Sequence, residues 1–128
     1  ECLKIDIPPW KKGIAVSSDE VIVVEHNWNE VRSCMWDYVG IVRSEKRLNR
    51  AKLRIQNLRK EIKQYYSDYV ITSDLLELRN LADVADIIIR SALNRKESRG
   101  LHHMSEYQNE NKKNIDTIIQ DVPGGPTT

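Results

Sequence analysis

The sequence predicts an all-α fold, namely a three-helix up-down-up bundle with an extended N-terminal leader and a flexible polar C-terminal tail. Apolar residues recur every three or four positions in three segments, as on the buried face of an amphipathic helix. Only short connections separate these segments, so consecutive helices must run antiparallel. We expect a leader at 1–20, a bundle at 21–108 and a partly disordered tail at 109–128. The predicted helices lie at about 27–42, 45–69 and 74–98.

The leader, residues 1–20, contains prolines and a glycine that interrupt regular structure. The apolar run 21–24 is too short to distinguish a buried strand from the first turns of a helix. Asn27 followed by Glu30 resembles a capping box, so we expect the first helix to begin there. Its apolar residues share one face: Trp28, Val31, Met35, Tyr38 and Val42.

The second predicted helix follows Ser44, a good N-cap residue, and has Glu45 in its first turn. Its apolar residues form an unbroken seam of the coiled-coil kind: Leu48, Ala51, Ile55, Leu58, Ile62, Tyr65 and Tyr69. The third helix follows the polar residues 72–74 and has a wider apolar stripe, so we expect it to be the most buried. Its predicted seam is Leu75, Leu78, Leu81, Ala85, Ile88 and Ala92.

The composition argues against several functional classes. The chain of 128 residues fits one domain, and its net charge of +1 argues against a dedicated polyanion-binding protein. No stretch approaches the ~20 apolar residues of a membrane-spanning helix. The first residues do not resemble a signal peptide, so we expect a cytoplasmic protein with no membrane partner.

The same survey finds no signature of catalysis or cofactor binding. The cysteines, Cys2 and Cys34, are too few for a disulfide scaffold or a zinc site. The adjacent His102 and His103 do not have the spacing of a metal-ligand pair, and the sequence has no glycine-rich phosphate-binding loop. We therefore predict no catalytic, cofactor-binding or metal-binding residue in this chain.

The second helix is rich in basic residues, with eight Lys or Arg against two Glu between positions 45 and 63. A free-standing helical module that binds nucleic acid through this face is therefore an alternative. However, the tyrosines lie at one end of the helix instead of alternating with the cations, as a base-stacking surface requires. We favour a solvated or internally paired face and expect no nucleic-acid partner.

Two other features suggest a contact surface. Trp28 and Trp36 lie eight positions apart, so their directions differ by about 80° around the helix, and burying both requires more than one neighbour. Further along, Arg95, Glu97, Arg99 and His102 gather where the third helix is expected to stop, around Gly100, a glycine suited to a helix end. Basic residues in a last turn often only complement the helix dipole, but this group also suits a corner where arginine–carboxylate pairs fix one domain against another.

Three stretches carry a resemblance to a known family. They are Met-Trp-Asp-Tyr-Val-Gly-Ile-Val-Arg at 35–43, Glu-Leu-Arg-Asn-Leu at 77–81, and Arg-Lys-Glu-Ser-Arg-Gly-Leu-His at 95–102. Residues 8–107 resemble the C-terminal domain of L-aspartate oxidase, which belongs with the flavoprotein subunits of succinate dehydrogenase and fumarate reductase. One departure is Glu-Tyr-Gln at 106–108, where the family usually has Asp-Tyr-Pro.

The resemblance implies a three-helix bundle appended to a flavin domain, in a longer cytoplasmic FAD-dependent enzyme. That enzyme oxidises L-aspartate to iminoaspartate, passes the electrons to oxygen or fumarate, and feeds quinolinate and NAD synthesis. The family's FAD-binding and substrate-binding residues lie upstream, so no catalytic residue is carried over and this chain alone is expected to bind no cofactor and to be inactive.

The expected partners are the upstream FAD-binding and capping domains, and an isolated fragment is expected to be able to self-associate through the surface meant for them. The candidate contact residues are Arg95, Glu97, Arg99, His102, Trp28 and Trp36. A flavoprotein subunit of succinate dehydrogenase or fumarate reductase, with an iron–sulfur partner, is the nearest alternative.

Overall fold

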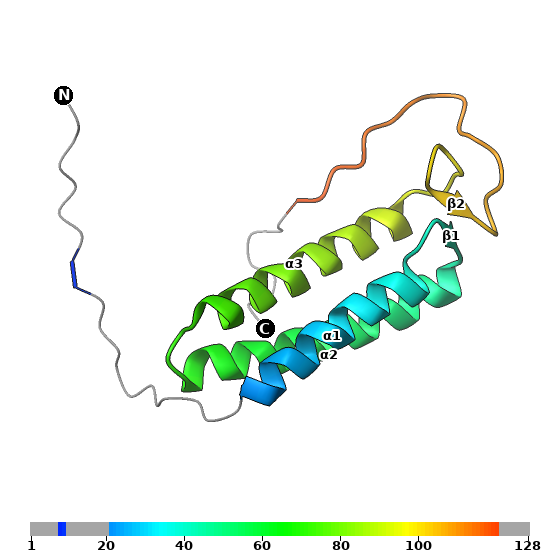
Figure 1. The fold of residues 1–128 in the computed structure, drawn as a ribbon. Helices are drawn as coiled ribbons and strands as arrows, with labels where there is room; N and C mark the ends of the chain where they lie inside the picture. Colours follow the sequence, from blue (N-terminus) through cyan, green and yellow to red (C-terminus); the bar gives the residue numbers. More distant parts are fainter. Residues whose placement is uncertain (1–7, 10–20, 121–128) are drawn as a thin grey trace.

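Three helices pack side by side in the computed structural model, which describes residues 8–9 and 21–120 (Figure 1). Helix α1 spans Val21–Tyr38, α2 spans Glu45–Asp68 and α3 spans Ser73–Asn94. Helices α1 and α3 run in one direction and α2 runs in the other (Figure 1). The predicted all-α, up-down-up bundle is therefore confirmed. The rest of the predicted leader and the last eight residues of the predicted tail lie outside the described residues.

Helix α1 begins at Val21 and ends at Tyr38, so the predicted range 27–42 is wrong at both ends. Asn27 does not cap the helix but lies buried inside it. Val24, four positions before Trp28, extends the apolar series by one turn and packs against the core. The packing of Val24 against the core outweighs the local capping signal at Asn27.

The predicted starts of the next two helices are supported by side-chain caps. Ser44 Oγ accepts the backbone N–H of Arg47 at 3.3 Å, and Thr72 Oγ1 accepts that of Leu75 at 3.2 Å. Each hydroxyl satisfies one of the amides that a helix start leaves without a partner.

The core is formed by all three helices together with residues from the connections. Its apolar members are Val31, Cys34, Val39, Leu48, Ala51, Ile55, Leu58, Ile62, Leu75, Leu78, Ala82, Ala85, Ile89, Ala92 and Met104. The seam predicted for α2 is buried as far as Ile62, and beyond it the half-buried rings of Tyr65 and Tyr69 stack with their centroids 5.1 Å apart.

Helix α3 differs from its predicted packing in one respect. It buries seven residues, compared with five in α2, but Ile88 of the predicted seam is exposed and Leu81 is only half-buried. Ala82 and Ile89, each one position later, lie in the core instead. The apolar stripe of α3 is wider than its buried face, so periodicity alone did not determine which edge faces inward.

A two-stranded parallel pair closes one end of the bundle. Strand β1, Val42–Arg43, follows α1, and strand β2, His103–Met104, follows α3. The backbone N–H of His103 donates to the carbonyl of Ile41, and that of Ser105 donates to the carbonyl of Arg43. This unpredicted pairing fixes the chain after α3 against the α1–α2 connection.

Asp86 joins α2 and α3 on one side of the bundle. Its Oδ2 lies 3.1 Å from Arg59 Nη1 and 3.0 Å from Arg90 Nε, and its side chain is almost completely buried. Arg59 Nε also pairs with the more exposed Asp83 at 2.9 Å. Some of the basic face of α2 is therefore paired with acidic residues of α3.

We expect Asp86→Asn to lower the free energy of unfolding of the 128-residue chain by about 1.5–3 kcal/mol, because it removes charge-assisted contacts to two arginines. Asp83→Asn is the matched control and should cost less than about 1 kcal/mol, because its pair with Arg59 is exposed. Urea denaturation followed by circular dichroism measures both. Equal losses would show that Asp86 does not join the helices as described.

Candidate functional site

The candidate contact residues that follow α3 lie outside the helix, in a segment that bends and turns. Helix α3 ends at Asn94, so its predicted extension to 98 is wrong. Gly100 does not end the helix but forms a turn, with a φ of 58° and backbone hydrogen bonds in both directions between Arg99 and His102. The backbone leaves the helix in an extended conformation at Arg95 and bends at Glu97, whereas a continued helix would turn residues two apart away from each other. Consequently Arg95, Glu97 and Arg99 converge.

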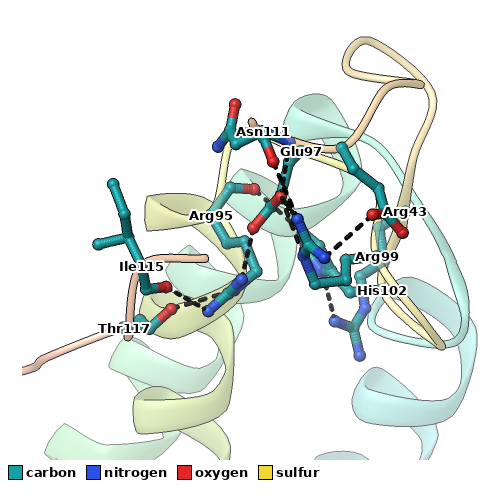
Figure 2. A network of polar contacts seen from close by, with 9 residues as sticks. Arg43, Arg95, Glu97, Arg99, His102, Asn111, Ile115 and Thr117 are labelled. Atoms are coloured by element: carbon teal, nitrogen blue, oxygen red, sulfur yellow. Dashed lines mark hydrogen bonds and ion pairs between the residues drawn. The ribbon is translucent and has the colours of Figure 1, made fainter. Parts of the chain in front are cut away.

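Glu97 lies at the centre of this corner, with a side chain only 3% exposed (Figure 2). Its carboxylate accepts Arg95 Nη1 at 2.5 Å, Arg99 Nε at 3.3 Å and the backbone N–H of Asn111 at 2.9 Å. The Asn111 hydrogen bond is the main cause that lowers the pKa of Glu97 below its ordinary value. Burial opposes this shift, and the two arginines reinforce it. The carboxylate is therefore held in its charged form.

The same two arginines hold the first part of the predicted tail (Figure 2). Arg99 Nη2 donates to the carbonyl oxygen of Asn111 at 3.0 Å. Arg95 Nη2 donates to the carbonyl oxygen of Ile115 at 3.0 Å, and its Nε donates to Thr117 Oγ1 at 3.1 Å. The segment 111–117 has no helix or strand, yet its backbone is tied to the end of α3.

His102 connects the corner to the α1–α2 connection. Arg43 Nη1 lies 2.8 Å from His102 Nδ1, and His102 Nε2 lies 3.0 Å from the carbonyl oxygen of Arg95. Because arginine only donates and a carbonyl only accepts, these contacts assign a neutral imidazole with its proton on Nε2. Arg43 Nε also donates to the carbonyl of Gly40 at 2.7 Å, and burial lowers the pKa of Arg43.

Arg43, like the tail residues that the network holds, was not among the candidate contact residues. It lies 59 positions from His102 in the chain, so no local spacing relates them. The feature of the sequence that points to Arg43 is its position at the end of the stretch 35–43, which carries the family resemblance. The parallel strand pair brings the two residues together.

Residues 106 and 107 fasten the corner to the start of α2. The backbone N–H of Glu45 donates to Glu106 Oε1 at 3.1 Å, and the hydroxyl of Tyr107 donates to Glu45 Oε1 at 3.0 Å. Lys96 also pairs with the side chain of Glu45. The hydrogen bonds from Lys96, the main cause, and from Tyr107 lower the pKa of Glu45. Glu106 and Tyr107, which lie where the sequence departs from the family's Asp-Tyr-Pro, thus both form hydrogen bonds with Glu45.

The two candidate tryptophans of α1 have different environments. Trp28 is half-buried and packs against the core, whereas Trp36 is 85% exposed. Among the polar contacts described for residues 21–120, neither joins the network around Glu97. Of the six candidates, four therefore form one corner, Trp28 contributes to packing, and Trp36 lies on the surface.

Several basic residues of α2 have partners within the bundle. Arg54 lies over the ring of Tyr38, 5.4 Å from its centroid, and Arg59 pairs with α3. A groove of about 570 Å³ between α2 and α3 is lined by residues including Lys60, Lys63, Arg79 and Tyr66. The guanidinium of Arg79 covers the Tyr66 ring at 4.8 Å, so that ring is not free to stack on a base. These contacts favour a structural role for the basic face.

The described part of the chain contains no cluster of three His, Cys, Asp or Glu residues able to hold a metal ion. Cys34 is buried in the core, and this burial raises the pKa of its thiol, which makes it a poor nucleophile. Within the same residues, none of the helices has both the length and the apolar character needed to cross a bilayer. The corner's charged groups pair with one another, which is typical of a structural ion-pair network.

Comparison with known proteins supports the resemblance seen in the sequence. Residues 28–119 match the family model described as "Fumarate reductase flavoprotein C-term". The chain is 50% identical over 113 residues to the L-aspartate oxidase of Pseudomonas aeruginosa, covering 88% of this chain and 21% of that protein. It is 50% identical over 114 residues to L-aspartate oxidase 1 of Ralstonia nicotianae, covering 89% of this chain and 21% of the relative.

A plant relative, the chloroplastic L-aspartate oxidase of Arabidopsis thaliana, is 40% identical over 105 residues, covering 77% of this chain and 16% of that protein. The chain thus spans about a fifth of the length of the bacterial relatives that it matches. The family model and the relatives thus both confirm the resemblance to the C-terminal domain of L-aspartate oxidases.

Proposed function

Because this chain belongs to the family of fumarate reductase flavoprotein C-terminal domains, we propose that it is the C-terminal domain of an FAD-dependent L-aspartate oxidase. The observation that carries the proposal is the 50% identity to bacterial L-aspartate oxidases over 88% of the chain. This aligned length includes far more than the core positions that any helical bundle needs. The proposed enzyme acts in the cytoplasm and supplies quinolinate and NAD synthesis.

In the proposed enzyme, L-aspartate loses two electrons and two protons to become iminoaspartate, and oxygen or fumarate finally accepts them. FAD is the group that takes up the electrons from the substrate. We assign no flavin contact to this domain, because the corner's charged groups pair with one another and the sequence has no glycine-rich phosphate loop. We assign flavin and substrate binding to the upstream FAD-binding and capping domains.

The role proposed for this domain is to support those upstream domains. Arg95, Glu97, Arg99 and His102 stabilise the end of the bundle through contacts within the chain. They would then act by keeping the corner and the bound segment 111–117 in one shape against the neighbouring domain. Trp36 is suited to a direct contact because its large amphipathic ring is exposed.

A second candidate is the C-terminal domain of a succinate dehydrogenase or fumarate reductase flavoprotein subunit. The description of the matching family model favours it. That protein would require an iron–sulfur subunit as partner, and it would oxidise succinate or reduce fumarate. The two candidates therefore differ in the substrate that reduces the flavin.

We expect anaerobic L-aspartate, but not succinate, to bleach the flavin absorbance of the purified full-length protein. The 128-residue chain purified alone should show no flavin absorbance, because this domain is assigned no flavin contact. Bleaching by succinate and not by aspartate would establish the second candidate. Flavin bound to the isolated chain would contradict the assignment of FAD to the upstream domains.

A further inference from the structure

Helix α3 exposes a row of aliphatic side chains on the side turned away from the core. They are Leu76, Val84, Ile87 and Ile88, and we call them the α3 outer face. At about 100° per residue these four positions fall within one third of the helix circumference. Single exposed aliphatic residues are common on protein surfaces, but a row along one helix indicates a contact surface.

The α3 outer face carries little unpaired charge. Its other exposed neighbours between 77 and 94 are Glu77, Asn80 and Asn94. Asp83 and Arg90, which are partly exposed at its edge, are held in ion pairs with Arg59 and Asp86. By contrast, the exposed side of α2 carries most of the eight basic residues between 45 and 63. Its exposed Leu53 is isolated between Lys52 and Arg54. Charged residues are depleted from the centres of protein interfaces, so α3 and not α2 has the character of a docking surface.

The bound part of the tail carries similar side chains close to the end of α3. Arg95, directly after α3, holds the carbonyl of Ile115 and the hydroxyl of Thr117. The side chains of Ile115 and Ile118 are nevertheless exposed. The network around Glu97 therefore keeps further aliphatic residues at the same end of the bundle without burying them.

We propose that the α3 outer face docks on an apolar surface of the upstream region of the same polypeptide. This inference rests on the proposed function. The bacterial relatives are about four times as long as this chain, whose aligned residues cover 21% of them, so the rest of such a protein would be a large partner joined to the domain. Covering four aliphatic side chains is favourable at about 25 cal/mol per Å² of apolar surface removed from water.

Thiol labelling of the native full-length protein tests the proposal. Ile87→Cys places a probe on the α3 outer face, and Leu53→Cys is the matched control on α2. Ile87 is 46% exposed and Leu53 64% exposed in the domain, so exposure alone predicts similar rates. We expect a maleimide to label position 87 at least about tenfold more slowly than position 53, because an interface must open before the reagent enters. In urea the two rates should be equal.

Equal native rates at the two positions would overturn the proposal. Protection of position 87 that disappears on dilution to a monomer would also overturn it, because a second copy would then be the occupant. If Ile87→Cys does not fold, Val84→Cys, at 53% exposure, replaces it. Protection at 87 in a protein whose flavin is not bleached by aspartate would reject the enzyme assignment and leave the docking face standing.

Discussion

Replacing Ile55 with alanine is expected to destabilise the bundle by about 2–5 kcal/mol. Ile55 lies in the middle of the α2 seam and is completely buried, so its truncation removes methyl groups from packed surroundings and leaves a cavity. Urea denaturation of the 128-residue chain measures the loss. Because only a few kcal/mol separate folded from unfolded chains, this variant should approach complete unfolding.

Leu53→Ala is the matched control for this experiment, since it lies two positions away on the exposed side of the same helix. It should change the free energy of unfolding by less than about 0.5 kcal/mol. A loss at Leu53 equal to that at Ile55 would mean that α2 is rotated relative to the orientation described.

Replacing Glu97 with glutamine is expected to loosen the corner and lower the melting temperature by several degrees. The variant removes the charge that Arg95 and Arg99 share, although it keeps the shape of the side chain. Both arginines also hold the segment 111–117, so a protease should cut this segment faster in the variant. Differential scanning fluorimetry and timed proteolysis measure the two effects.

The effect of Glu97→Gln should depend on pH. The pKa of Glu97 is lower in the folded protein than its ordinary value of 4.5, so the charged carboxylate favours folding. This contribution is complete above pH 4.5 and is lost as the pH falls through the lower folded-state pKa. The difference in melting temperature between the original protein and the variant should therefore be largest at neutral pH and shrink steadily below pH 4.5.

Glu110→Gln provides the control, because Glu110 also pairs with Arg99 but is largely exposed. It should change the melting temperature little at any pH. A companion variant, Arg99→Ala in the full-length protein, should lower melting temperature and flavin retention more than the turnover of enzyme that keeps its flavin. Unchanged stability and flavin content in Arg99→Ala would contradict a role for the corner in supporting the upstream domains.

Local patterns predicted those features of the fold that depend on local physics. The seam from Leu48 to Ile62 was read correctly because a helix that buries one face must repeat its apolar residues every three or four positions. The cap at Ser44 was predicted, and one of the polar residues 72–74 expected before the third helix, Thr72, caps it, since a cap requires only a hydroxyl three residues before an amide. The cap expected at Asn27 failed because the same signal carries no information about the burial of the preceding turn.

The candidate corner was predicted as a group, but its geometry was not. Arg95, Glu97 and Arg99 were placed in and just after the last turn of a helix, where residues two apart face different directions. Their convergence requires the helix to end at Asn94 and the following backbone to bend, an arrangement that Asn111 and the β1–β2 pair support from distant parts of the chain. Trp28 and Trp36 were grouped by spacing, although only the packing of the bundle decides that one is half-buried and the other exposed.

The amino-acid sequence by itself determined the helical class, the number and order of the helices, and the family resemblance, because periodicity and motifs are properties of neighbouring residues. Only the tertiary structure decided the rotation of α3, the pairing of Arg43 with His102 across 59 positions, and the row of aliphatic residues left uncovered. The physical reason is that burial and long-range hydrogen bonds depend on which surfaces meet. Because the apolar stripe of α3 is wider than the surface that α1 and α2 cover, the packing of the whole bundle decides which of its residues are buried.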